Sequence, residues 1–461
     1  MRGPLFFYTG AMETIAIIGG GAAGLAAAVA AGEAARARGC AVRVVVYEAS
    51  DRVGRSILAT GNGRCNFSNA VVDAARYRNG AFVAAALEAL EEVAGAADAP
   101  APEAGAAADG AAGAAAGASG AAGAGAGSSN AVLRFFADHG LLWRRESEGR
   151  LYPLANKATS VLDVLRAAAA AVGAQERCGI AVAAVEPPRG AGRPFTLRLA
   201  DGRLERAAAV IVAVGGALPA GLLPAELPVA PPQPTLGPLA TEARWCRRLD
   251  NIRVRGVLEL RRDDALRARE PGEVMFRKYG VSGIAAFNLS RLAQPGDVLA
   301  VDFVPAVEAA AMADFLRERC CRLDAVLGRA ATWDDMLRGM VLGPVAEVLL
   351  DAAGLRGGAP VATGEVPAMA AVLKGLRLPV TGLGDPRQCQ VHRGGLRASA
   401  VDVATCAVVA VPGLFVVGEA LDVDAPCGGY NLHWAWASGL LAGRAAVARM
   451  AGRPESKERA R

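Results

Sequence analysis

The chain has 461 residues, enough for two or three domains, and 53% of them are apolar and 21% charged. These proportions exclude a mainly disordered protein and a small disulfide scaffold. The 50 basic and 45 acidic residues are interspersed and give a net charge of only +5, so we expect no basic face for a nucleic acid. Mean hydropathy is +0.28, mainly from alanine, and no run of about 20 large apolar residues predicts a membrane span.

Cysteine and histidine usage argues against a metal site or a dithiol pair. The nine cysteines are odd in number and spread out without a CxxC pair, and there are only three histidines. Residues 1–11 carry one Arg and too short an apolar run for a signal peptide, and Met12 is a candidate natural start. We therefore expect a cytoplasmic protein. Only four of the 50 basic residues are lysines, a usage typical of GC-rich bacterial genomes.

The first elements in chain order form the pattern of a βαβ unit. Residues 14–18 are a short apolar run suited to a buried parallel strand, 22–38 predict a helix, and 42–47 predict a second buried strand. Further elements follow along the chain. We expect helices at 131–139, 160–172 and 432–451, mainly helical structure over 309–355, and strands at 180–185, 195–199, 210–214 and 414–417.

Residues 95–129 differ in composition from the rest of the chain. They are Ala, Gly, Ser and Pro with three acids, and they contain no aromatic residue and no Leu, Ile or Val. Each glycine costs a helix about 1 kcal/mol, and nothing in the segment can anchor a core. We predict a disordered Ala/Gly surface insertion. Residues 219–238 are punctuated by prolines, which suits a crossing between domains.

A glycine motif joins the first predicted strand to the first predicted helix. Gly19 permits a tight turn, Gly21 lets the backbone approach a pyrophosphate, and Gly24 lets the helix pack on the strand. Glu48 ends the second strand, where its carboxylate can accept hydrogen bonds from a ribose. A carboxylate there fits FAD or NAD and argues against NADP, whose 2′-phosphate it would repel. The residues expected at the dinucleotide are Gly19, Gly21, Ala22, Ala23, Gly24 and Glu48.

Two separated segments resemble a bacterial flavoprotein family. Residues 54–69, GRSILATGNGRCNFSN, are similar to the family pattern GRKxLxSGxGRCNxTN. Residues 413–424, GLFVVGEALDVD, followed by GGYNL at 428–432, are similar to GLYFxGExLDVxGxxGGYNLQ. Shorter runs at 149–153, 272–276 and 279–283 also match. From about residue 13 to 449, the insertion aside, the chain resembles the BaiN-like or YhiN-like (aminoacetone-oxidase-like) family of FAD-binding NAD(P)/FAD-dependent oxidoreductases.

The resemblance implies an α/β fold with a two-dinucleotide-binding, Rossmann-like FAD domain. This domain is expected to be discontinuous, from residues 12–94, 130–218 and 385–452. Residues 219–384 are then an inserted, β-rich substrate or cap domain with a helical subdomain at about 309–355.

The resemblance also implies a non-covalent FAD whose far end is lined by distant segments. FAD is long, so a flavin ring must lie well away from the first βαβ unit. The glycine pair 428–429 precedes the last helix, whose N-terminal dipole can face the flavin N1/C2=O edge, and glycine admits a flat ring without a Cβ clash. The implied cofactor-binding residues are Arg55, Gly61, Asn62, Gly63, Arg64, Cys65, Asn66, Val182, Gly215, Gly216, Gly418, Glu419, Asp422, Gly428, Gly429, Tyr430 and Asn431.

Several of these residues have alternative interpretations. Cys65, a catalytic candidate, is either a redox partner or adduct former, or a small packed residue beside glycines. Arg64 either neutralises a phosphate or anionic substrate or makes a salt bridge, and Arg55 is the better phosphate candidate. Tyr430 and Asn431, the other catalytic candidates, either act at the ring or form its wall.

The chain departs from the family pattern at a few positions. Arg277 and Lys278 stand where the family has Thr-His, and Ile284 replaces a proline. His392 takes the place of a Thr, so no role is carried over to it. The stretch after Gly216 is also shorter than in the family. These changes favour a different substrate pocket or a weakened activity.

The predicted function is FAD-dependent hydride transfer through flavin N5, with NAD(P)H-linked reduction of a small or conjugated organic substrate. Because no second GxGxxG occurs, NAD(P)H is expected to visit as a transient co-substrate. The alternatives are an amine oxidase that uses oxygen, and a degenerate flavin-binding protein without activity. An RNA-modifying flavoenzyme would need a basic groove that the charge pattern does not predict. We expect a small-molecule substrate and no nucleic-acid or membrane partner, with the oligomeric state left open.

Overall fold

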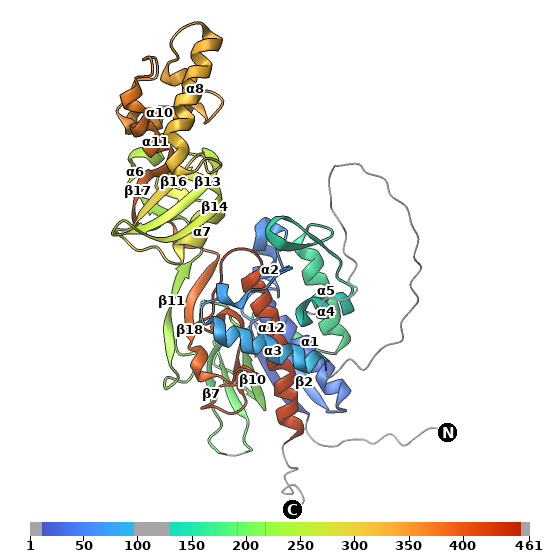
Figure 1. The fold of residues 1–461 in the computed structure, drawn as a ribbon. Coiled ribbons are helices and arrows are strands. Elements are labelled where there is room, and N and C mark those ends of the chain that lie inside the picture. Colours follow the sequence, from blue (N-terminus) through green and yellow to red (C-terminus); the bar gives the residue numbers. More distant parts are fainter. Residues whose placement is uncertain (1–11, 96–129, 191, 217, 453–461) are drawn as a thin grey trace, which may run out of the picture. The chain divides into compact units, whose positions relative to one another are not determined.

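A computed structural model describes residues 12–95, 130–190, 192–216 and 218–452. The predicted insertion at 95–129 lies, apart from Gly95, outside the described residues. The chain divides into two compact units (Figure 1), the first from Met1–Gln233 with Arg393–Arg461 and the second from Pro234–His392. We expected boundaries after residues 218 and 384. The chain passes between the units within β11 (Val229–Thr235) and β18 (Val391–Leu396), which pair with each other.

The first unit is built on a five-stranded parallel sheet in the order β19-β10-β1-β2-β6. Four of these strands coincide closely with predicted ones, because buried parallel strands are short runs of Val and Ile. The fifth, β6, has the polar sequence QERC, which gives no such signal. The strands are β1 (Glu13–Ile18), β2 (Val42–Glu48), β6 (Gln175–Cys178), β10 (Ala209–Val212) and β19 (Leu414–Val416).

Small residues let α1 (Ala22–Ala37) and α12 (Tyr430–Ala451) pack at close range. A Cβ atom at Gly439 would lie 2.4 Å from the carbonyl oxygen of Ala23, and one at Gly443 would lie 2.4 Å from that of Ala27. These distances are far below van der Waals contact, so only glycine fits.

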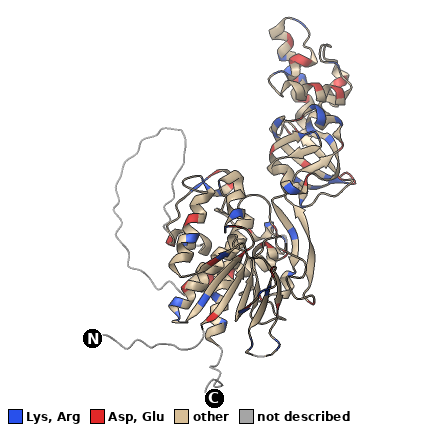
Figure 2. Ribbon diagram, turned by 180° about the vertical axis from the view of Figure 1, so that it is seen from behind, with Lys and Arg blue, Asp and Glu red and all other residues tan. Residues whose placement is uncertain are grey.

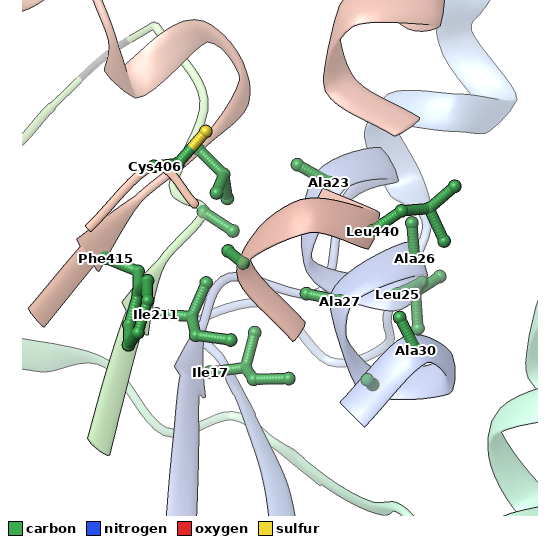
Figure 3. Packing of buried hydrophobic residues seen from close by; sticks show 14 of the residues in the cluster. Ile17, Ala23, Leu25, Ala26, Ala27, Ala30, Ile211, Cys406, Phe415 and Leu440 are labelled. Atoms are coloured by element: carbon green, nitrogen blue, oxygen red, sulfur yellow. The ribbon is translucent and has the colours of Figure 1, made fainter. Parts of the chain in front are cut away.

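Figure 3 shows this core, with Ile17, Ile211 and Phe415 from three neighbouring strands in one cluster with the alanines of α1 and Leu440 of α12. Much of the alanine in the chain is therefore buried structure. The predicted helix at 432–451 begins two residues earlier, at Tyr430.

Smaller elements complete the first unit. Two three-stranded antiparallel sheets have the orders β3-β5-β4 and β7-β8-β9. Their strands are β3 (Ser68–Asn69), β4 (Trp143–Arg145), β5 (Arg150–Pro153), β7 (Val182–Glu186), β8 (Phe195–Leu199) and β9 (Leu204–Ala207). The remaining helices are α2 (Arg55–Ala59), α3 (Gly80–Gly95), α4 (Ala131–Asp138) and α5 (Ala158–Ala171).

The second unit is a closed barrel with helices, and it has its own buried core. The barrel order is β12-β15-β14-β13-β16-β17, with strands β12 (Leu239–Thr241), β13 (Arg253–Arg262), β14 (Ala265–Arg277), β15 (Gly280–Ser282), β16 (Val298–Asp302) and β17 (Leu376–Leu383). The helices are α6 (Ala243–Arg248), α7 (Ile284–Ser290), α8 (Met312–Leu327), α9 (Trp333–Leu337), α10 (Gly343–Ala353) and α11 (Val366–Gly375).

The helical part of this unit thus continues into α11, beyond the expected 309–355. Among the helices of the described residues, none is long and apolar enough to cross a membrane. Figure 2 shows basic and acidic residues interspersed on the ribbon.

Candidate functional site

Residues distant in sequence meet at one edge of the parallel sheet. Gly19 follows β1, Glu48 ends β2, Gly215 follows β10 and Gly418 follows β19. These strands are parallel, so their carboxyl ends lie at the same edge, where open α/β sheets bind their ligands. The four strand ends therefore bring most of the predicted dinucleotide residues together.

The turn from β1 to α1 needs its glycines for backbone contacts within the protein. A Cβ at Gly24 would lie 1.9 Å from the carbonyl oxygen of Gly19, and one at Gly19, where φ is +104°, would lie 2.4 Å from that of Ala213. Gly21 is the N-cap of α1 and supplies no side-chain cap. The first N–H groups of α1, from Ala22 and Ala23 onwards, are thus available to an anion.

Glu48 holds this turn through both carboxylate oxygens. Oε2 accepts a 2.8 Å hydrogen bond from the N–H of Gly20, and Oε1 accepts one of 2.8 Å from the N–H of Ser50. The backbone carbonyl of Glu48 also accepts a hydrogen bond of 2.9 Å from the N–H of Ile180. That contact brings the start of β7, with Val182, to the end of β2.

The segment after β19 lies directly against the start of α1. A Cβ at Gly418, where φ is +63°, would lie 3.1 Å from the Cβ of Ala23. The N–H of Gly418 donates to Ser438 Oγ at 2.9 Å, and Trp434 Nε1 donates to the carbonyl of Gly418 at 3.1 Å. Helix α12 thus fixes Gly418 and Glu419 beside the glycine turn, although some 400 residues separate the two segments in the chain.

The loop after α2 has an unusual backbone. Gly61, Asn62 and Gly63 have φ values of +55°, +55° and +80°, and Cys65 has +59°. Left-handed conformations are strained for residues with a side chain, and glycine adopts them freely. A Cβ at Gly63 or at Gly215 would meet nothing within 4 Å, so both glycines border open space.

Arg64 contacts the β4–β5 hairpin and the turn that follows it. Its Nε donates to Asn156 Oδ1 at 2.6 Å, its guanidinium forms an ion pair with Glu146, and it lies 4.1 Å from the ring centroid of Tyr152. Arg64 thus forms a salt bridge in this structure, and its contact with a phosphate or an anionic substrate stays a prediction. Arg55, in contrast, is largely exposed and lies 3.7 Å from Asp51.

Cys65 is completely buried, and this burial raises the pKa of its thiol to about 11. None of the nine cysteines is paired in a disulfide. At neutral pH the thiol is protonated and a poor nucleophile. These observations favour the packed, structural interpretation of Cys65.

The loop at Gly428 and Gly429 is held by Asn69. Its Nδ2 donates to the carbonyl of Gly428 at 2.9 Å and to that of Glu148 at 3.0 Å. A Cβ at Gly429 would lie 2.2 Å from the carbonyl of Ser68, so this glycine is required by contact with β3. Asn69 lies in the family-like segment but was not among the predicted site residues.

Tyr430 and Asn431 both have defined contacts. The Tyr77 hydroxyl donates to the carbonyl of Tyr430 at 2.8 Å, and their rings meet edge to face at 5.9 Å. The Asn431 side chain accepts from the N–H of Ala425 and donates to its carbonyl. Asn431 therefore closes the loop from 425 to 431, and burial raises the pKa of Tyr430, which keeps its phenol protonated at neutral pH.

Asp422 belongs to a buried ionic network. Its Oδ1 accepts hydrogen bonds from Arg78 Nε at 2.8 Å and from the N–H of Gly394 at 3.1 Å. Two residues further on, Asp424 is fully buried and forms two hydrogen bonds with Arg393. This network joins the family-like segment to β18. Sequence reasoning missed Arg78 and Arg393 because neither lies near Asp422 in the chain.

Three substituted positions, Arg277, Lys278 and Ile284, lie in the second unit. Arg277 donates to Asn251 Oδ1 at 2.5 Å, and the N–H of Lys278 donates to Asp250 Oδ1 at 3.1 Å, at the turn between β14 and β15. Ile284 is 39% exposed and begins α7. Over the described residues, no cluster of three His, Cys, Asp or Glu side chains is suited to hold a metal ion.

The residues present fit FAD on three independent observations. The two helix N-caps at the site, Gly21 of α1 and Gly429 of α12, supply no side-chain cap. Gly63 and Gly215 border open space in left-handed conformations. The buried Oδ1 of Asn66 has no hydrogen-bond partner among the described residues, although buried acceptors are nearly always paired.

The glycine turn, the acid that ends β2 and the glycine loops at the same sheet edge define an FAD-dependent oxidoreductase with a Rossmann-like domain. A family model described as the HI0933-like protein Rossmann domain matches residues 127–445, and the chain belongs to this family. The resemblance inferred from residues 54–69 and 413–432 is thereby confirmed.

Individual proteins are similar over most of their length. The 3-dehydro-bile acid delta(4,6)-reductase of Clostridium scindens is 29% identical over 95% of this chain and 100% of its own. The ribosomal RNA dihydrouridine synthase of Escherichia coli is 25% identical over 92% of this chain and 95% of its own. A solved quinol fumarate reductase from E. coli is 17% identical, covers 97% of this chain and 72% of its own, and has a TM-score of 0.44.

Proposed function

We propose that the chain is an NAD(P)H-linked reductase of a small organic substrate with a conjugated double bond. Bound FAD would supply a hydride acceptor and donor at N5, between NAD(P)H, which becomes NAD(P)⁺, and a substrate that gains the hydride and a proton. The observation that carries the proposal is the convergence of Gly19, Glu48, Gly215 and Gly418 at one sheet edge. The full-length similarity to a named reductase supports the direction of the reaction.

The chain's own residues would hold and orient the cofactor. The N–H groups at the start of α1 would bind the pyrophosphate, and Glu48 would face the adenosine ribose beside Val182. The unpaired Oδ1 of Asn66 would accept a hydrogen bond from a donor on the isoalloxazine. The N-terminus of α12 at Gly429 would stabilise negative charge on the ring. Cys65 would support the loop as a buried, protonated thiol. Arg64 would support it through its ion pair with Glu146.

A nucleobase in RNA is a second candidate substrate, favoured by the similarity to the ribosomal RNA dihydrouridine synthase. The expected absence of a nucleic-acid partner rests on the weak net charge of +5 and on the interspersion of basic and acidic residues along the chain. A small molecule is the better-supported class, because the bile acid reductase is the more similar of these two relatives and is matched over its entire length.

Anaerobic visible spectroscopy of the FAD-loaded protein tests the proposal. NADH or NADPH should bleach the flavin absorbance, while aminoacetone should not. Bleaching by aminoacetone and by neither nucleotide would establish the amine oxidase instead. Reduction by dithionite alone, with no turnover of any donor above the free-flavin rate, would identify a degenerate flavin-binding protein.

A further inference from the structure

A hollow of about 360 Å³, with charged side chains in its lining, opens beside the glycine loop of the first unit. Tyr430, which follows Gly429 at the start of α12, forms part of its wall. Asn69 also lines it and holds the carbonyl of Gly428. The hollow is therefore adjacent to the loop that we assign to the flavin, and its volume lies at the lower end of the range of about 300–1,000 Å³ typical of small-molecule sites.

Each carboxylate that lines the hollow has an arginine partner, and one further lining arginine has no carboxylate partner among the described residues. Glu146 and Glu148 line it, but Glu146 is already paired with Arg64 and Arg144, and Glu148 with Arg150. Each of these carboxylates is thus neutralised by a partner of its own.

The third lining carboxylate, Asp73, lies 4.0 Å from Arg76, which also lines the hollow. Arg145, at the end of β4, completes the charged lining; it is exposed, and its side chain makes no hydrogen bond or ion pair within the described part of the chain. The hollow therefore presents an uncompensated guanidinium, which suits a phosphate group.

The wall of the hollow also offers flat surfaces. The guanidinium of Arg76 lies 5.5 Å from the centroid of the Tyr430 ring. An aromatic ring and a planar cation side by side favour a planar, anionic ligand. A phosphorylated heteroaromatic compound combines both features.

We propose that this hollow binds the nicotinamide mononucleotide half of NAD(P)H, with its phosphate on Arg145 and its ring beside Tyr430. This inference rests on the proposed function and locates the donor site within it. It also accounts for the lack of a second GxGxxG motif, because the phosphate would be bound by an arginine side chain and not by a glycine turn.

Stopped-flow reduction of the FAD-loaded protein by NADH and NADPH tests the inference, with Arg145→Ala compared to the parent. Removing one charged phosphate contact should raise the apparent Kd for the donor about tenfold and leave the limiting rate constant within about twofold. Arg145→Lys should restore part of the affinity, and added salt should weaken donor binding less in Arg145→Ala than in the parent.

Arg38→Ala is the matched control, because Arg38 is also exposed, its side chain makes no hydrogen bond or ion pair with the residues that the structure describes, and it lies at the far end of α1 from the glycine turn. It should change neither constant. If Arg145→Ala leaves the donor Kd unchanged, or raises only the KM of the organic substrate, the inference is overturned and the proposed function stands. If no nucleotide reduces the parent flavin while dithionite does, the proposed function itself fails.

Discussion

The side-chain amide of Asn69 donates a hydrogen bond of 2.9 Å to the carbonyl oxygen of Gly428, a residue 359 positions further along the chain. The same amide donates to the carbonyl of Glu148, and its Oδ1 accepts from the N–H of Val71. One buried side chain thus ties the glycine loop of α12 to the small sheet that carries the hollow. The shape of the loop that we assign to the flavin therefore depends on a residue far away in the chain.

Asn69→Ala should weaken FAD binding by about tenfold, because the loss of hydrogen bonds worth about 0.5–1.5 kcal/mol each frees the loop at Gly428. Flavin fluorescence titration of the apoprotein measures the change. Asn130→Ala is the control, since Asn130 caps α4 through its side chain and should affect unfolding without altering FAD affinity. Equal FAD affinities in Asn69→Ala and the parent would show that Asn69 does not shape the site.

Cys65→Ala should keep the rate of flavin reduction within about twofold of the parent, since a thiol with a pKa of about 11 carries little thiolate at neutral pH. In alkylation experiments at pH 8 followed by peptide mapping, Cys65 should remain unmodified in the folded protein. Cys321, which is exposed, is the internal control and should react. Abolished flavin reduction in the alanine variant would instead assign Cys65 a redox role.

Gly443→Ala should destabilise the protein by about 1–3 kcal/mol, because the new Cβ would lie 2.4 Å from the carbonyl oxygen of Ala27. In a helix without such packing the same change would stabilise by up to about 1 kcal/mol, so the sign is diagnostic. Gly452→Ala places its Cβ at an ordinary 3.5 Å from Ala448 and should be nearly neutral. Urea unfolding of the three proteins measures both effects, and stabilisation by Gly443→Ala would contradict the packing of α1 on α12.

The parent protein should lose stability as the pH falls, and His433→Gln should lose less of it. Burial lowers the pKa of His433 to about 3, below the value of about 6.5 expected when unfolded. The unfolded state therefore binds more protons between these values, and stability falls by up to about 1.4 kcal/mol per pH unit as the pH drops below 6.5. The His433 ring is hydrogen-bonded to the Ser68 hydroxyl at 2.9 Å. Glutamine, which stands at the position of His433 in the family pattern, can still form a hydrogen bond with Ser68.

His139→Gln provides the opposite case for the same unfolding series. A hydrogen bond with Glu33 raises the pKa of His139, so its contribution to stability is present at low pH and is lost as the pH rises through the folded pKa. On acidification, the free energy of unfolding of His433→Gln should therefore rise relative to the parent. That of His139→Gln should fall relative to the parent. Parallel pH profiles for parent and His433→Gln would refute the buried, neutral state of His433.

Much of the fold was predictable because most strands of the parallel sheet are short apolar runs in the sequence. β1, β2, β8, β10 and β19 coincide with predicted strands to within two residues at each end. The polar β6 and the two-residue β3 carry no such periodic signal, so both were missed. Long-range pairing defines them, and pairing between distant segments cannot be inferred from local pattern.

The sequence indicated which segments form the candidate site. It did not indicate which side chains hold those segments in place. The glycine motifs and Glu48 marked the segments that meet at the sheet edge, because backbone requirements are local. The partners that fix them are not local: Asn69 for Gly428, Ser438 for Gly418, and the β4–β5 hairpin for Arg64. The structure also separates glycines required by protein contacts, such as Gly24 and Gly429, from Gly63 and Gly215, which border open space.

The most direct test is an FAD titration of the apoprotein, followed by the visible absorbance of the flavin and completed by anaerobic addition of NADPH or NADH. We predict saturation at one FAD per chain, weaker binding by Glu48→Gln, and bleaching by at least one nucleotide. A protein that takes up no FAD after refolding with it, or whose bound flavin neither nucleotide reduces, would contradict the account.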